Sequence, residues 1–183
     1  WSTVISFQTL TEVLYLKLMA KEFIYEASLL EFLHKHNCTG LPNIVATNNA
    51  DGSFVMKHAG NPLRHSLKQS YDLSIVCNTL KSYAKLQINC IPHIASLIKI
   101  GVGDWRLGKL TNLYKQFLLK EEFLLSDGLT PDEIHTLRHL SDNFETLCTK
   151  LSNLGIPETL EHGDFHDANI LLNKDKITIA DFG

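Results

Sequence analysis

The sequence lacks the features that mark several common classes of protein. It has no apolar run long enough to span a bilayer and no repeat or low-complexity tract. Its formal net charge of −3 offers no basic surface for a nucleic acid. We also find no signal-peptide pattern. We therefore expect neither a membrane nor a nucleic-acid partner, and we expect a cytoplasmic location.

Cysteine is sparse and unpatterned. The four cysteines show neither the C-x-x-C spacing nor the Cys/His spacing of metal sites: Cys38, Cys77, Cys90 and Cys148. Scattered thiols of this kind suit a reducing cytosol, so we expect them to be reduced and mostly buried. The 183 residues, 44% of them hydrophobic and 20% charged, are enough to bury a sizeable core in one or two units.

The most informative stretch is the carboxyl-terminal one, residues 161–183. It holds Asp164, then Asn169 five residues later, then Asp181. Transfer of a γ-phosphoryl group depends on positioning, on metal ions at the phosphate oxygens and on a carboxylate that receives the proton of the acceptor hydroxyl. Magnesium takes oxygen ligands and keeps several waters. This order of residues predicts Asp164 as the catalytic base, with Asn169 and Asp181 as magnesium ligands.

A short hairpin is expected between the two metal ligands. Residues 170–172 and 177–180 are apolar, and the four residues between them are polar. Two strands around such a turn would bring Asn169 back towards Asp181. An Asp-x-x-x-x-Asn pair alone is commonly a turn whose side chains bond to local backbone. The hairpin and the second aspartate make the functional interpretation the better one.

These residues also carry a resemblance. His162-Gly163-Asp164, with His166 and Asn169, is similar to the H-G-D-x-H-x-x-N loop of the aminoglycoside phosphotransferase and choline kinase-like family, which is related to the protein kinases. Protein kinases carry H-R-D and a lysine two residues after the aspartate, whereas this chain has Gly163 and His166 at those positions. The resemblance therefore implies a small-molecule hydroxyl acceptor.

The segment Asp181-Phe182-Gly183 has the spelling found in protein kinases, whereas the antibiotic kinases more often have tryptophan and an acidic residue after the aspartate. A kinase that acts on serine or threonine side chains of proteins is therefore a first alternative. We give the catalytic loop more weight, because the acceptor sits there.

The amino-terminal part predicts the phosphate-binding side chains. Residues 3–8 and 12–19 indicate two strands, and Lys17 lies on the face opposite Leu14, Leu16 and Leu18. The resemblance implies that such a lysine reaches the α- and β-phosphates of ATP.

A helical period over residues 20–36 follows, and it contains Glu26. In the related kinases a glutamate on this helix holds the lysine, so we expect Glu26 to pair with Lys17. Glu22, one turn earlier, is the competitor.

Residues 44–47 and 53–58 predict a second hairpin, and the next segment is similar to the one that links the two lobes of these kinases. The resemblance implies that the backbone of Lys57, His58 and Ala59 bonds the adenine edge and that Met56 packs behind the adenine. The rest of the chain before the catalytic loop reads as helical. Helices are predicted from Ser70 or Asp72 to about Asn89, over residues 107–125, and from Thr130 through an apolar stripe to Leu154.

Together these patterns predict an α+β, two-lobed, protein-kinase-like fold. Residues 1–60 form a small antiparallel-sheet lobe with one helix, and residues 61–183 form a mainly helical lobe. ATP and Mg²⁺ are expected between the lobes. No glycine-rich loop precedes the first strand and the sequence stops where relatives continue, so we expect both lobes to be incomplete.

The function predicted from the sequence is ATP- and Mg²⁺-dependent transfer of a phosphoryl group to a hydroxyl of a small molecule, such as an aminoglycoside, choline or a sugar. A second alternative is a nucleotide-binding pseudokinase without catalysis. It is motivated by the missing glycine-rich loop and by Tyr15, because relatives have a smaller residue over the adenine. The sequence leaves the oligomeric state open.

Overall fold

The computed structural model describes residues 2–48 and 50–182, so Trp1, Asn49 and Gly183 lie outside the described residues. The chain divides into two compact units. The first comprises Trp1–Val102 and Thr159–Gly183, and the second comprises Gly103–Glu158. The predicted lobe boundary near residue 60 falls inside the first unit and stays a prediction. Among the described residues, no helix combines the length and the apolar character needed to cross a membrane.

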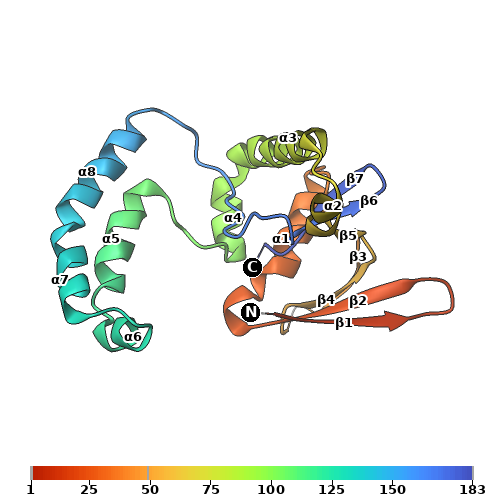
Figure 1. Cartoon of the computed structure of the whole chain (residues 1–183), viewed down its shortest axis with the longest axis horizontal. Coiled ribbons are helices and arrows are strands. Elements are labelled where there is room, and N and C mark those ends of the chain that lie inside the picture. The colour runs from red at the N-terminus through yellow and green to blue at the C-terminus, as the bar shows by residue number, and fades with distance from the viewer. Residues whose placement is uncertain (1, 49, 183) are drawn as a thin grey trace. The chain divides into compact units, whose positions relative to one another are not determined.

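A four-stranded antiparallel sheet occupies the start of the first unit (Figure 1). Its strands are β1 (Ser2–Gln8), β2 (Val13–Met19), β3 (Ile44–Asn48) and β4 (Ser53–Lys57), in the order β1-β2-β4-β3. The Thr9 hydroxyl donates to the Glu12 carbonyl at 2.8 Å and so closes the first hairpin. All four strands were predicted from apolar, β-branched and aromatic segments around short turns, to within two residues at each end. The sheet and the helices that follow confirm the predicted α+β class.

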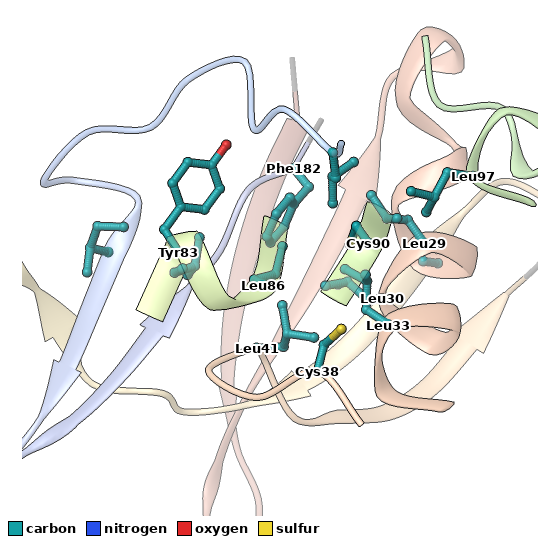
Figure 2. Packing of buried hydrophobic residues seen from close by; sticks show 14 of the residues in the cluster. Leu29, Leu30, Leu33, Cys38, Leu41, Tyr83, Leu86, Cys90, Leu97 and Phe182 are labelled. Carbon is teal, nitrogen blue, oxygen red and sulfur yellow. The ribbon is translucent and has the colours of Figure 1, made fainter. Parts of the chain in front are cut away.

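Helix α1 (Tyr25–Lys35) follows a short 3₁₀ turn, η1 (Lys21–Phe23), and provides the main core of the first unit. Leu29, Leu30 and Leu33 are fully buried. Figure 2 shows them beside Cys38, Leu41, Leu86, Cys90 and Leu97, with Tyr83 at one end of the cluster and its hydroxyl pointing away from the aliphatic side chains. Complete burial of one helix face removes roughly 1.5–3 kcal/mol of unfavourable hydration for each leucine. The core therefore fixes how α1 presents its first turn, where Glu26 lies.

A second, three-stranded antiparallel sheet contains β5 (Asn61–Pro62), β6 (Ile170–Asn173) and β7 (Lys176–Ile179), in that order. The β6–β7 pair is the hairpin predicted from sequence, with a two-residue turn in which Lys174 has φ 54°. Gly60, just before β5, has φ 120°, and a Cβ there would meet the Leu172 carbonyl oxygen at 2.3 Å. Only glycine fits this close approach of the linker to β6.

Three helices complete the first unit: α2 (Leu63–Gln69), α3 (Leu73–Cys90) and α4 (Ile94–Ile100), the last preceded by the 3₁₀ turn η2 (Ile91–His93). Asp72 caps α3 by accepting a hydrogen bond from the backbone N–H of Ser74 at 2.8 Å. Of the two predicted cap residues, Asp72 is therefore the one used.

The second unit is helical throughout its regular structure. It contains α5 (Leu107–Phe117), α6 (Glu121–Ser126), α7 (Pro131–His139) and α8 (Ser141–Ser152), with α5 beside α8 (Figure 1). The capping box predicted at Thr130 is present, because Thr130 and Glu133 exchange hydrogen bonds between side chain and backbone.

Two helices of the second unit were predicted to be continuous, and this prediction is wrong because each is divided into two shorter helices. The helix over residues 107–125 is interrupted at residues 118–120, and the one after Thr130 is interrupted at Leu140. After the second interruption the inward face of α8 runs through Phe144 and the buried Cys148. Leu147 and Leu151 are 55% and 46% exposed, so the predicted buried stripe is wrong in this half. A break of one residue rotates all later positions about the helix axis, which periodicity alone does not reveal.

Candidate active site

The centre of the candidate site is a buried ammonium group between two carboxylates. Lys17 lies on β2 between β1 and β4, and only 3% of it is exposed. Its Nζ lies 2.5 Å from Glu26 Oε2 and 2.5 Å from Asp181 Oδ1. A buried lysine is stable as a cation only where such partners offset its lost hydration. The structure thus forms the Lys17–Glu26 pair predicted from sequence and adds Asp181 to it.

Glu26 also holds the segment that carries Asp181. Its Oε1 accepts a hydrogen bond from the backbone N–H of Phe182 at 3.1 Å. Burial raises the pKa of this carboxyl, although the neighbouring Lys17 ammonium acts in the opposite direction. Glu22, the competing glutamate one turn earlier, is exposed.

A second cluster gathers around Asp164 in the loop before β6. The Asn169 amide nitrogen donates to the Asp164 carbonyl at 3.0 Å and to its Oδ2 at 3.2 Å. His166 Nε2 lies 3.3 Å from the same Oδ2. The Asp164 side chain is 64% exposed and so is accessible from solvent.

The β6–β7 hairpin joins the two clusters. Ile170 pairs with Ile179, and the Ala180 N–H donates to the Asn169 carbonyl at 2.9 Å. This contact places the residue before Asp181 directly beside the backbone of Asn169, as the hairpin predicted. Asp181 itself has φ 67°, in the left-handed region that non-glycine residues seldom adopt. The hydrogen bonds of the neighbouring residues Ala180 and Phe182 keep Asp181 in this strained conformation, which is typical of functional sites.

His162 fixes the base of the same loop in one tautomer. Its Nε2 lies 2.9 Å from the Ala180 carbonyl and must donate, and its Nδ1 accepts from the Asp164 N–H at 3.3 Å. The ring is buried and burial lowers its pKa. The neutral ring with its proton on Nε2 satisfies both contacts.

Two side chains that the sequence did not single out anchor this loop. The Tyr83 hydroxyl accepts from the His162 N–H at 2.9 Å and donates to Glu161 Oε1 at 3.2 Å. Arg64 donates its Nε to Asp167 Oδ1 at 2.9 Å, and its backbone N–H bonds the Asp167 carbonyl at 3.0 Å. Both partners are at least 78 residues away in sequence, so no local spacing signals them.

The four linker residues predicted to hold the adenine have different surroundings. The Lys57 N–H already donates to the Asn43 carbonyl at 2.9 Å. Its ammonium pairs with Glu12 on the surface. The Lys57 N–H is therefore already paired, and Met56 packs against the hydrophobic core. The predicted contacts of these four residues with a nucleotide stay predictions.

Tyr15 lies two residues before Lys17 and so shares its face of β2. Its hydroxyl lies 3.1 Å from His58 Nδ1, and the two rings stack with centroids 5.7 Å apart. The linker and the strand that carries Lys17 are thus tied together by one polar contact.

The chemistry of the donor set fits a magnesium ion. Asn169 uses its amide nitrogen for Asp164, which leaves its amide oxygen for a metal. The Asp181 carboxylate is 43% exposed. Among residues 2–48 and 50–182, no three His, Cys, Asp or Glu side chains converge as a metal cage. A magnesium ion that is also bound by nucleotide phosphates and waters needs no such cage.

A cavity lies elsewhere in the first unit. Its volume is about 410 Å³, and it lies between Glu31 and His34 of α1 and residues 43–47 at strand β3. None of its lining residues belongs to the candidate site.

Comparison with solved structures gives a structural likeness at low sequence identity. No family model and no curated protein sequence matches the chain. The AMP-bound complex of a spectinomycin phosphotransferase, APH(9)-Ia, aligns with 99% of this chain and 63% of its own, at 16% identity and a TM-score of 0.46. The complex of the same enzyme with ADP and spectinomycin aligns with 99% and 59%, at 17% identity and 0.38. The chain thus spans less than two thirds of these neighbours, and a likeness at this level assigns it no activity.

Proposed function

We propose that this chain belongs to a cytoplasmic phosphotransferase that moves the γ-phosphoryl group of ATP to a hydroxyl of a small molecule. The observation that carries the proposal is the contact of Lys17 with both Glu26 and Asp181, at 2.5 Å each. A buried lysine held in this way is suited to bind phosphate oxygens, because an ammonium group attracts an anion more strongly in a site with little water.

Each side chain has a distinct role in the proposed reaction. Asp164 accepts the proton of the acceptor hydroxyl, and its 64% exposure leaves room for the acceptor. Lys17 binds the phosphates of the nucleotide, and Glu26 keeps Lys17 in place. Asn169 orients Asp164 through the hydrogen bond from its amide nitrogen to Oδ2.

Asn169 and Asp181 would hold the magnesium ion, through the amide oxygen and a carboxylate oxygen. When bound, the ion supplies positive charge at the phosphate oxygens. In the structure Asp181 shares Lys17 with Glu26, so we propose that the phosphates of ATP and Asp181 divide the Lys17 ammonium between them. The rigid β6–β7 hairpin then limits how far Asn169 and Asp181 move apart.

The acceptor is proposed to be a small molecule because the loop around Asp164 resembles that of the antibiotic and choline kinases. Gly163 and His166 replace the arginine and the lysine that protein kinases carry there. His166 lies 3.3 Å from the Asp164 carboxylate, where it contributes a ring in place of a mobile ammonium group.

One contact favours a second candidate, a protein that binds the nucleotide without transferring phosphate. The Tyr15 hydroxyl lies 3.1 Å from His58 Nδ1, at the place proposed for the adenine. Entry of an adenine requires this contact to open, or the base to stack on it. A protein that senses the nucleotide tolerates such a barrier better than an enzyme that turns over.

The deciding experiment is a transfer assay with the intact protein, γ-labelled ATP and Mg²⁺. The acceptor panels are aminoglycosides including spectinomycin, choline and sugars on one side, and serine and threonine peptides on the other. Label on a small molecule that disappears with Asp164→Asn supports the proposal. Label on peptides alone establishes the protein-kinase alternative. Mg²⁺-dependent ATP binding with no transfer to either panel establishes the non-catalytic candidate.

A further inference from the structure

Two histidines outside the candidate active site point their ring nitrogens at each other. His135 and His139 lie one turn apart on α7, in the second unit, and both are exposed. Their Nε2 atoms are 2.9 Å apart. The rings are nearly perpendicular, at 83°, with centroids separated by 4.3 Å. In the free protein one Nε2–H donates to the other Nε2.

This separation is also that of two nitrogen ligands on one metal ion. Imidazole nitrogens bind divalent transition metals at about 2.0–2.1 Å, so two of them 2.9 Å apart subtend an angle of about 90° at the metal. A right angle belongs to adjacent positions of a square-planar or tetragonal complex, which Cu²⁺ and Ni²⁺ prefer. A tetrahedral Zn²⁺ site requires a wider angle and hence a greater separation.

We propose that His135 and His139 form a binding site for a divalent transition-metal ion of tetragonal geometry, Cu²⁺ or Ni²⁺. The metal takes the place of the proton between the two Nε2 atoms, and the donating imidazole carries its proton on Nδ1 instead, so that both rings bind the ion as neutral imidazoles. Such a site is unrelated in chemistry to the magnesium ligands Asn169 and Asp181, which offer oxygen atoms. It does not depend on the proposed phosphotransferase activity.

The helix that carries the pair is well fixed at its start. The Thr130 and Glu133 capping box closes the first turn, and Pro131 at the first helical position favours the helical backbone. Side chains four residues apart lie one above the other, so a rigid α7 presents the two imidazoles in a constant geometry. Less conformational entropy is then lost when the ion binds.

Neighbouring charges leave the pair accessible to a cation. Arg138 adjoins His139 in sequence, but its guanidinium donates to the Leu118 carbonyl at 2.9 Å and lies 2.7 Å from Glu121. Its charge is therefore directed away from the histidines. Asp132 precedes His135 by three residues and adds negative charge to the same face of α7.

Calorimetric titration of the intact protein, free of any polyhistidine tag, with CuCl₂ and NiCl₂ tests the proposal. We expect one site with higher affinity for Cu²⁺ than for Ni²⁺, because an imidazole site follows the Irving–Williams order, and excess MgCl₂ should not compete for it. His135→Ala and His139→Ala should each lower the Cu²⁺ affinity at least tenfold. The electron paramagnetic resonance spectrum of the Cu²⁺ complex should show two nitrogen ligands in the wild type and fewer in either variant.

Two matched variants serve as controls. His65→Ala removes an exposed helical histidine that has no histidine four residues away. His36→Ala breaks the other close histidine pair, in which the His36 and His93 rings lie 4.0 Å apart. Both should retain wild-type Cu²⁺ affinity. Metal-free melting curves check that all variants fold; alanine preserves the helix at the exposed helical positions 65, 135 and 139, and His36 lies just after the end of α1.

The proposal is overturned if His135→Ala and His139→Ala bind Cu²⁺ as tightly as the wild type, or if His36→Ala alone removes the binding. A second readout is thermal. Saturating Cu²⁺ should raise the Tm of the second unit by a few degrees in the wild type and leave it unchanged in His139→Ala, because a ligand that binds only the folded state stabilises it.

Discussion

The Glu26 carboxylate accepts a hydrogen bond from the backbone N–H of Phe182 at 3.1 Å, across 156 residues of sequence. The same carboxylate holds Lys17 through its other oxygen. Helix α1 therefore positions both the ammonium group on β2 and the segment that carries Asp181. A change at Glu26 is expected to reach both functional groups at once.

The first prediction concerns this glutamate. Glu26→Gln retains an oxygen for the Phe182 N–H but removes the charge that faces Lys17, which is 3% exposed. We expect the free energy of unfolding to fall by roughly 1–2 kcal/mol, less than the usual cost of breaking a buried ion pair, because Asp181 still compensates the Lys17 charge. We also expect at least a tenfold loss of ATP affinity. Urea unfolding and nucleotide titration measure the two effects.

Glu22→Gln is the matched control, because it makes the same change one turn earlier at an exposed position. It should alter stability by less than about 0.5 kcal/mol. If Glu22→Gln costs ATP affinity and Glu26→Gln does not, the assignment of the lysine partner is wrong.

The second prediction separates chemistry from binding at Asp164. Asp164→Asn preserves the size of the side chain and removes the proton acceptor, so kcat should fall about 10²- to 10⁴-fold while the KM for ATP changes little. Asp175→Asn makes the same change at an exposed position beside the β6–β7 turn and should leave both constants unaltered. Steady-state kinetics with the acceptor found in the transfer assay give the comparison. A kcat for Asp164→Asn within twofold of wild type would remove Asp164 from the mechanism.

The sequence carried enough information to predict the strands, the Lys17–Glu26 pair and the hairpin between Asn169 and Asp181. Apolar, β-branched and aromatic residues on either side of short turns marked β1, β2, β3 and β4. The spacing from Asn169 to Asp181 predicted a hairpin, and the structure pairs Ile170 with Ile179 inside it. These features are local, so they are readable without knowledge of the fold.

Features that depend on tertiary packing were not readable. The interruption at Leu140 has no proline or glycine to mark it, and the apolar stripe continues through it. Two contacts join segments far apart in sequence: Tyr83 with His162, and Arg64 with Asp167. The sequence around a helical tyrosine or arginine does not indicate which distant residue it will contact. Such contacts appear only once the core has placed α2 and α3.

The third prediction is an acid sensitivity due to His162. Burial lowers the pKa of this imidazole in the folded state below its ordinary value of 6.5. As the pH falls through 6.5, the unfolded chain therefore binds the proton first, and the folded state loses stability until its own pKa is reached. Protonation of Nδ1 would also turn two donors, Nδ1–H and the Asp164 N–H, towards each other.

Urea unfolding between pH 7.5 and pH 5.5 measures this loss. His162→Gln should be less stable than wild type at pH 7.5 but should lose less stability on acidification, while exposed His65→Gln should follow the wild-type slope. The raised pKa of Glu26 acts in the opposite direction, because its contribution is lost as the pH rises above 4.5. It is common to all three proteins and cancels in the comparison. Equal slopes for wild type and His162→Gln would contradict the prediction.

The last prediction assigns Tyr83 a positioning role for the loop that carries Asp164. Its hydroxyl accepts from the His162 N–H at 2.9 Å, and its ring stacks on Phe165 with centroids 4.2 Å apart. Burial raises the pKa of this hydroxyl to about 12, so it stays protonated wherever the protein is active and can donate to Glu161. Tyr83→Phe keeps the stacked ring and leaves a buried N–H without its acceptor, at a cost of about 1–3 kcal/mol.

If the hydroxyl positions the catalytic loop, Tyr83→Phe lowers kcat roughly tenfold with the KM for ATP unchanged, because Lys17 and Glu26 are not touched. Tyr114→Phe removes a comparable hydroxyl, which donates to the Leu137 carbonyl at 2.9 Å in the second unit. It should lower stability without changing kcat. A purely structural role for Tyr83 would instead give the two variants the same kcat and a similar loss of stability, so the ratio of their kcat values distinguishes positioning from packing.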